Sequence, residues 1–148
     1  MRPGRYWRID LDALNALGHG SLVGLLGIVI LAADEGAVHA RLPVRPDLMA
    51  PNGFLHAGSV VALADTACGY GTYLGLPAGA EGFATVELAS NHVGTARDGV
   101  IECRATRVHA GRSTQVWDAR VTGEGDRAVA LFRCTQLILW PRRDGAAP

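Results

Sequence analysis

The chain has 148 residues, 14 of them basic and 14 acidic, a length typical of one domain with its own core. The balanced charge argues against nucleic acid or an anionic membrane as a partner, because both attract proteins that carry excess Lys and Arg. The longest apolar run, residues 22–33, has 12 residues, well short of the ~20 that a membrane helix needs. The start, residues 1–8, leads into no apolar signal core. Three widely spaced cysteines form no CxxC pair, so we expect reduced thiols and a cytoplasmic protein.

The first half of the chain predicts a short helix, two strands and a long helix. Asp10 can cap a helix over residues 10–18, which a glycine-rich stretch follows as far as residue 27. Residues 27–33 predict a buried strand, and the alternation of residues 38–44 predicts a second strand with one buried face. After a loop, residues 56–76 predict a long helix, closed by Pro77.

The second half predicts strands only. Residues 85–91 alternate, which predicts Val86 and Leu88 on one face and Thr85 and Glu87 on the other. Turn signals separate three further predicted strands, at residues 100–108, 114–122 and 128–140. No linker divides the chain, so we expect one domain over residues 1–148, with a frayed tail at 141–148. A nearly uncharged helix needs cover, and an antiparallel sheet wrapped around it, an α+β fold, supplies that cover.

Several common chemistries have no signature in this chain. There is no GxSxG elbow and no Walker A motif, and the five histidines show no metal-ligand spacing. We therefore expect neither a bound metal nor a cofactor.

One carboxylate is the strongest functional signal. Asp65 is the only charged residue between positions 57 and 80, and burial of a lone carboxylate is costly unless it supplies pairing or chemistry. Asn52 and His56 stand just ahead of the same helix. Each has a structural interpretation as well: Asp65 can cap a loop or pair with an arginine, His56 can open the helix, and Asn52 can serve as a turn residue.

The helix start offers a complementary chemistry. The amides of Ala57 and Gly58 are expected to be free donors at the positive end of the helix dipole, where they can stabilise an oxyanion. Asp65, in apolar surroundings, is suited to act as general base or as nucleophile. Eight residues along one helix separate Ala57 from Asp65 by ~12 Å. Either the two groups do not cooperate, or the site joins two protomers.

The segment from Asn52 to Ala67 resembles the hotdog-fold thioesterases of the phenylacetate-pathway (PaaI-like) group. Its N-G-x-x-H-A-G-S-V-V-A-L-A-D-T-A run is similar to their Asn/Gly loop, His-Gly-Gly start and following L-A-D. The segment T-V-E-L-A-S-N-H, residues 85–92, resembles their next strand, and Gly111-Arg112-Ser113 resembles their Gly-Arg/Lys turn. Ala57 departs from the pattern, since glycine is usual there, and the added methyl group narrows the expected pocket.

The resemblance implies a role for each matching residue. Asp65 is the implied base or nucleophile, the amide after His56 contributes to the oxyanion hole, and Asn52 and His56 position water or the thioester carbonyl. Thr85 matches a hydroxyl that assists the carboxylate. The remaining candidate residues, all expected to contact substrate, are Gly58, Arg112 and Ser113, with Arg112 directed to a phosphate of coenzyme A.

The function implied is hydrolysis of an acyl-CoA thioester to a carboxylic acid and free coenzyme A, without metal, by a homodimer commonly paired into a homotetramer. The alternatives are a non-catalytic acyl-CoA-binding or regulatory hotdog protein, a hotdog hydratase or dehydratase, and a purely structural module. Retention of Asp65 argues against the first and last. Candidates for the acyl pocket are Leu63, Tyr70, Tyr73 and Phe83.

Overall fold

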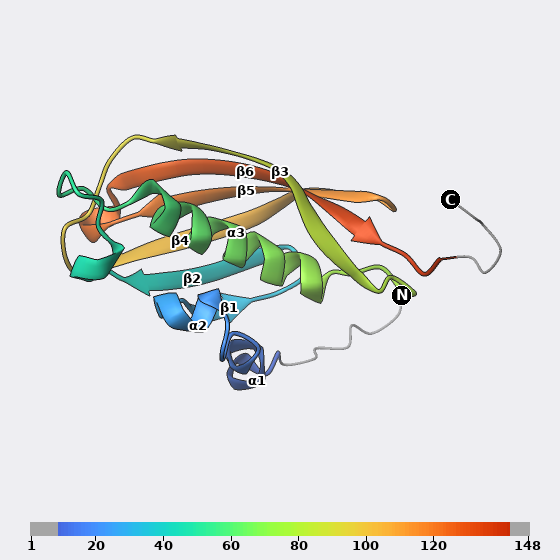
Figure 1. The fold of residues 1–148 in the computed structure, drawn as a ribbon. Helices are drawn as coiled ribbons and strands as arrows, with labels where there is room; N and C mark the ends of the chain where they lie inside the picture. Colours follow the sequence, from blue (N-terminus) through green and yellow to red (C-terminus); the bar gives the residue numbers. More distant parts are fainter. Residues whose placement is uncertain (1–8, 143–148) are drawn as a thin grey trace.

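The computed structural model describes residues 9–142; the predicted start at 1–8 and most of the predicted tail, 143–148, lie outside them. One antiparallel sheet has the strand order β1-β2-β4-β5-β6-β3. A long helix, α3 (Ala57–Leu74), runs along one face of this sheet (Figure 1). The strands are β1 (Val29–Ala33), β2 (Ala37–Pro43), β3 (Gly82–His92), β4 (Val100–Ala110), β5 (Thr114–Thr122) and β6 (Ala128–Leu139). The shorter helices are α1 (Leu11–Ala16), α2 (Leu22–Leu26) and the single turns η1 (Pro46–Leu48) and η2 (Glu124–Asp126).

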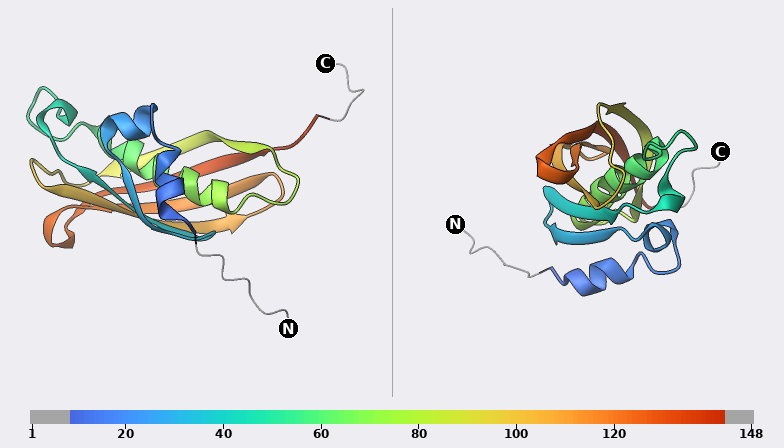
Figure 2. Two further views of the ribbon diagram at one scale, coloured as in Figure 1. Left: turned by 90° about the horizontal axis from the view of Figure 1, so that it is seen from below. Right: turned by 90° about the vertical axis from the view of Figure 1, so that its left-hand side faces the viewer.

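The sheet curls around α3, as the end-on view in Figure 2 shows. Most inward positions of the strands are apolar, and they form one core with the buried side of α3. At its centre the ring of Trp117 is fully buried, and it lies so close to Gly71 that a Cβ atom there would be 2.2 Å from the ring. This architecture confirms the predicted α+β fold with a sheet wrapped around a helix. Within residues 9–142, no helix has the length and apolar character needed to cross a membrane.

The two ends of α3 follow from local chemistry. His56 is the N-cap, and its Nδ1 accepts a hydrogen bond from the Gly58 amide at 2.8 Å. At the other end the Gly75 amide donates to the Gly71 carbonyl at 3.0 Å. The helix therefore ends two residues before the predicted position 76, because the residue before Pro77 is restricted to extended conformations.

The predicted alternation at the start of β3 is wrong, because the strand contains a bulge. Thr85 pairs with Gln136 and Glu87 pairs with Thr135, so Val86 is the extra residue. The bulge puts Thr85 on the face that carries α3, and Leu88, opposite Cys134, shares that face. A strand without the bulge would have turned the Thr85 hydroxyl to the outer face.

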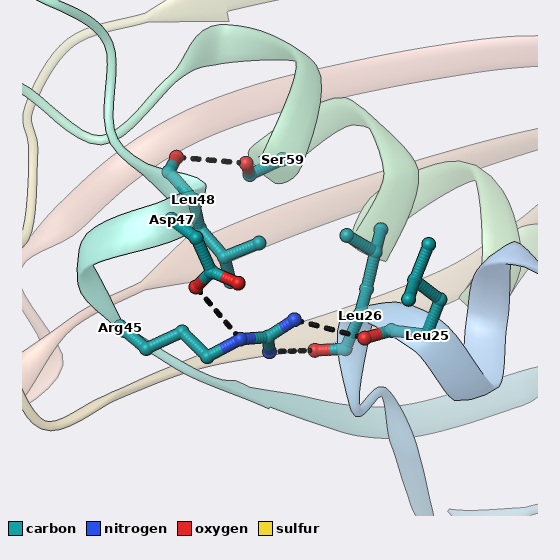
Figure 3. A network of polar contacts seen from close by, with 6 residues as sticks. All are labelled: Leu25, Leu26, Arg45, Asp47, Leu48 and Ser59. Carbon is teal, nitrogen blue, oxygen red and sulfur yellow. Dashed lines mark hydrogen bonds and ion pairs between the residues drawn. The ribbon is translucent and has the colours of Figure 1, made fainter.

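A short helix, α2, occupies part of the glycine-rich stretch, where the sequence predicted no element. Arg45 ties its end to the following loop (Figure 3). The guanidinium donates to the carbonyls of Leu26 at 2.6 Å and Leu25 at 2.8 Å, and it pairs with Asp47 at 2.8 Å. Cations stabilise the exposed carbonyls at a helix C-terminus. Arg45 therefore fixes α2 against the loop that leads to α3.

Candidate active site

Asp65 lies half-buried midway along α3, beside a cavity of about 210 Å³. Thr85 is the polar partner of this carboxylate, with its Oγ1 3.1 Å from Asp65 Oδ1. Burial raises the pKa of Asp65, and the Thr85 hydroxyl partly opposes that rise. A carboxylate with these properties is a stronger base than an exposed one, as a general base or a nucleophile requires.

The cavity beside Asp65 is mainly apolar, and Asp65 is the only charged residue among the described residues that line it. Val23 of α2, Tyr70 of α3 and Phe83 of β3 line it together with Gly69 and Thr66. Burial also raises the pKa of Tyr70. Two of the four predicted pocket residues thus lie at the cavity.

The other two predicted pocket residues lie elsewhere. Leu63 is part of the core, and Tyr73 is exposed.

The start of α3 presents one amide rather than two. The Gly58 amide was predicted to be a free donor, but it donates a hydrogen bond to His56 Nδ1. The Ser59 and Val60 amides both donate to the His56 carbonyl. Among the described residues, none accepts from the Ala57 amide, which the geometry of a helix start leaves without an intrahelical partner.

A second cavity, of about 280 Å³, opens at this helix start. Ala57 lines it, together with Phe54 and His92, the last residue of β3. Asn52 is exposed, and its Oδ1 accepts from the Phe54 amide at 3.2 Å. This contact is the local turn that Asn favours.

Arg112 and Ser113 lie in the turn between β4 and β5. The Arg112 guanidinium lies 5.2 Å from the centre of the Trp140 ring. The backbone carbonyl of Arg112 accepts a hydrogen bond from Trp140 Nε1 at 3.0 Å. The Ser113 carbonyl accepts from the Ile138 amide. These contacts hold the turn against the end of β6 and leave both side chains exposed.

The structure therefore divides the predicted site residues among three places. Asp65 and Thr85 meet at the middle of α3, and Arg112 and Ser113 lie at the end of the sheet where α3 ends (Figure 1). Around the start of α3 lie Asn52, His56, Ala57 and Gly58.

One polar partner was missed by the sequence analysis. Gln136 is fully buried on β6, with its Oε1 2.8 Å from Thr85 Oγ1. Its signal in the sequence was an amide that alternates with the apolar residues Phe132, Cys134 and Ile138 on one face of the strand.

Comparison with known proteins shows the family of the chain. The family model of the thioesterase superfamily matches residues 52–130. The 1,4-dihydroxy-2-naphthoyl-CoA hydrolase of Escherichia coli is 33% identical over 132 residues, which cover 89% of this chain and 96% of that protein.

Two crystal structures are also similar. A variant of thioesterase PA1618 from Pseudomonas aeruginosa has a TM-score of 0.85 at 32% identity, covering 90% of this chain and 96% of that one. Thioesterase HI1161 from Haemophilus influenzae has a TM-score of 0.83 at 32% identity, covering 92% and 94%. The predicted superfamily is confirmed, while the phenylacetate-pathway subgroup stays a prediction. The chain therefore belongs to the thioesterase superfamily, as a thioester hydrolase with the hotdog fold.

Proposed function

We propose that the protein hydrolyses acyl-CoA thioesters to a carboxylic acid and free coenzyme A, with Asp65 as the reacting carboxylate. The observation that carries this proposal is the Asp65–Thr85 pair beside a mainly apolar cavity. As a general base, Asp65 takes a proton from the water that attacks the thioester carbonyl; as a nucleophile, it forms an anhydride that water then hydrolyses. The thiolate of coenzyme A leaves in either case.

The oxyanion of this reaction needs a donor, and the free Ala57 amide is suited to that role. Along one helix Ala57 lies ~12 Å from Asp65, too far for both to contact one carbonyl. We therefore propose a site shared between two protomers, with the Ala57 amide of one facing Asp65 of the other. His56 and Asn52 border the Ala57 side of this shared site.

Strand β3 is the edge through which the two protomers would pair. It ends the strand order, and Val86 and Leu88 are 56% and 41% exposed on it. If two copies of β3 pair antiparallel about their centres, Gly82 of one lies opposite His92 of the other. That arrangement brings the cavity beside Asp65 to the partner's cavity at the helix start, because Phe83 borders the first and His92 the second. The homotetramer stays a further prediction.

Arg112 is proposed to contact a phosphate of coenzyme A, since it is an exposed cation held in a fixed turn. A cytoplasmic location is also proposed, and the three free, buried cysteines support it.

Hydrolysis is tested with short-chain, medium-chain, long-chain and aryl acyl-CoAs, by following release of the free thiol. We expect turnover of at least one class, and Asp65→Asn is expected to lower kcat by at least ~10² while the substrate still binds. Binding without turnover by the unaltered protein would favour the alternative of a non-catalytic acyl-CoA-binding protein. A folded Asp65→Asn variant with near-normal turnover would show that this carboxylate is structural.

A further inference from the structure

Gln136 is a buried amide that the proposed reaction leaves without a role. Its neighbours at the inward positions of β6 are Phe132, Cys134 and Ile138, all apolar and buried. Burial of an amide in such surroundings is unfavourable unless its polar atoms have partners. Gln136 has two of them: its Oε1 lies 2.8 Å from Thr85 Oγ1, and its Nε2 donates to Cys134 Sγ at 3.4 Å.

The contacts of Thr85 exceed what its hydroxyl can donate. The Thr85 oxygen lies 2.8 Å from Gln136 Oε1 and 3.1 Å from Asp65 Oδ1. A hydroxyl carries one hydrogen, and an amide oxygen and a carboxylate both only accept. When Asp65 is ionised, one of the two oxygens therefore goes without a donor. When Asp65 is protonated, it donates to Thr85, Thr85 donates to Gln136, and all three groups are satisfied.

We propose that Gln136 is a positioning residue for Asp65, which acts by competing with the Asp65 carboxylate for the single hydrogen of the Thr85 hydroxyl. Gln136 thereby favours the protonated carboxyl over the carboxylate. A carboxyl that keeps its proton to higher pH is a stronger base once it ionises. The residue acts through Thr85 and does not contact the cavity beside Asp65.

The other groups around Asp65 do not replace this effect. Val23 of α2 lines the cavity, as do Phe83 and Thr85 of β3, so neither element places a charge beside Asp65. The titratable groups nearby are Tyr70 and Cys68 on α3, with Cys134 on β6 beyond Cys68. Burial raises the pKa of Tyr70, and the hydrogen bond with Cys134, together with burial, raises the pKa of Cys68, so both groups stay neutral. Among the residues that line the cavity, none is basic.

The test is a carbon-13 NMR titration of the Asp65 carboxyl in the unaltered protein and in Gln136→Met. The methionine keeps the approximate volume and removes the competing acceptor. We expect the midpoint of Asp65 to fall by about half to one pH unit. Gln136→Leu serves as a second variant if Gln136→Met does not fold. Gln115→Met is the matched control, because Gln115 is the buried cross-strand neighbour of Gln136 and bonds to Gly75 and Trp117 instead.

A double-mutant cycle separates competition for the hydrogen from a general packing effect. In a Thr85→Val background the hydroxyl is absent, so Gln136→Met should leave the Asp65 midpoint unchanged. The proposal is overturned if the midpoint stays constant in folded Gln136→Met, if it shifts equally in the Thr85→Val background, or if Gln115→Met shifts it as much.

The kinetic measurement rests on the proposed function, and the titration does not. If Asp65 reacts in its ionised form, the acidic limb of the pH profile of kcat/KM should move with the NMR midpoint. A shifted midpoint with an unmoved limb would support the role of Gln136 and contradict the proposed role of Asp65.

Discussion

Asp65 shows at the scale of one residue how a reactive group opposes stability. Burial raises its pKa, so the folded protein binds a proton that the unfolded chain has already released in the pH range above 3.8. The free energy of unfolding therefore falls as pH rises through the interval between the unfolded and folded pKa values, and the loss persists at neutral pH.

We accordingly expect Asp65→Asn to melt at a higher temperature than the unaltered protein at pH 7, since the amide carries no charge to desolvate. Below the ordinary pKa of 3.8 both proteins have a neutral side chain, and the difference should vanish. Calorimetry across this range checks the prediction. A variant that is less stable at pH 7 would indicate that the carboxylate makes stabilising contacts in the folded protein.

Arg112 carries the prediction about coenzyme A. Arg112→Ala should raise KM for acyl-CoA about tenfold, as expected for loss of one charge-assisted hydrogen bond. A truncated acyl-pantetheine thioester, which lacks the nucleotide phosphates, should respond little. Arg120→Ala is the control, since Arg120 is exposed on the outer face of β5, while its chain neighbours Ala119 and Val121 are buried on the inner face. Equal effects on both substrates would exclude a phosphate contact by Arg112.

At the scale of elements, the packing of α3 on β5 depends on a missing side chain. A Cβ atom at Gly71 would stand 2.2 Å from the Trp117 ring, which is fully buried. We expect Gly71→Ala to destabilise the protein by roughly 1–3 kcal/mol, because the ring has no room to retreat. Urea unfolding measures this loss.

The control for that variant is Gly69, two residues away on the same helix. At Gly69 a Cβ atom would stand 3.4 Å from the Phe83 ring, close to ordinary contact. Gly69→Ala should therefore be tolerated or slightly stabilising, as alanine is the better helix former. Similar losses in both variants would mean that helix propensity and not the Trp117 contact dominates.

Most elements could be predicted from the sequence, because hydrophobic periodicity reports burial directly. The long helix and six strands appear at nearly the predicted positions. The bulge at Val86 could not be predicted, since the pairing partner on β6 decides it and the alternation of residues 85–91 hides it. The end of the short helix α2 bonds to Arg45, which lies 19 residues from Leu26, so the sequence around α2 does not show this contact. The glycines in and around α2 argued against a helix there.

Parts of the candidate site could be predicted from the sequence where a reactive residue stands out from its neighbours along the chain. Asp65 stood out as a lone charge in an apolar helix, and its Thr85 partner came with the family resemblance. Gln136 was missed because its contact with Thr85 joins positions 51 residues apart. The Gly58 amide was predicted to be free because the sequence placed His56 at the helix start but did not show that its Nδ1 accepts from this amide.

At the scale of the whole molecule, the proposed shared site predicts complementation between two defective chains. His56→Asn and Asp65→Asn should each be inactive alone, and asparagine at position 56 preserves a helix cap. Random reassociation of equal amounts makes half of the dimers mixed, each with one intact site of two. We therefore expect ~25% of the unaltered activity to return under two-fold symmetry.

Subunit exchange must be shown independently, with chains of distinguishable mass, and both variants must be folded. No recovery after verified exchange would place His56 and Asp65 in the same site of one chain, or remove one of them from catalysis. Sedimentation of the unaltered protein as a monomer would contradict the shared site outright.

The three cysteines have a consequence for how the native protein reacts with thiol reagents. Cys68, Cys103 and Cys134 are fully buried, and burial raises the pKa of Cys103 to about 12. Thiol reagents react with the thiolate. The native protein should therefore remain unlabelled, while released coenzyme A is labelled at once. Any slow labelling of the protein then counts openings of its interior, and its rate reports how often the sheet and α3 separate.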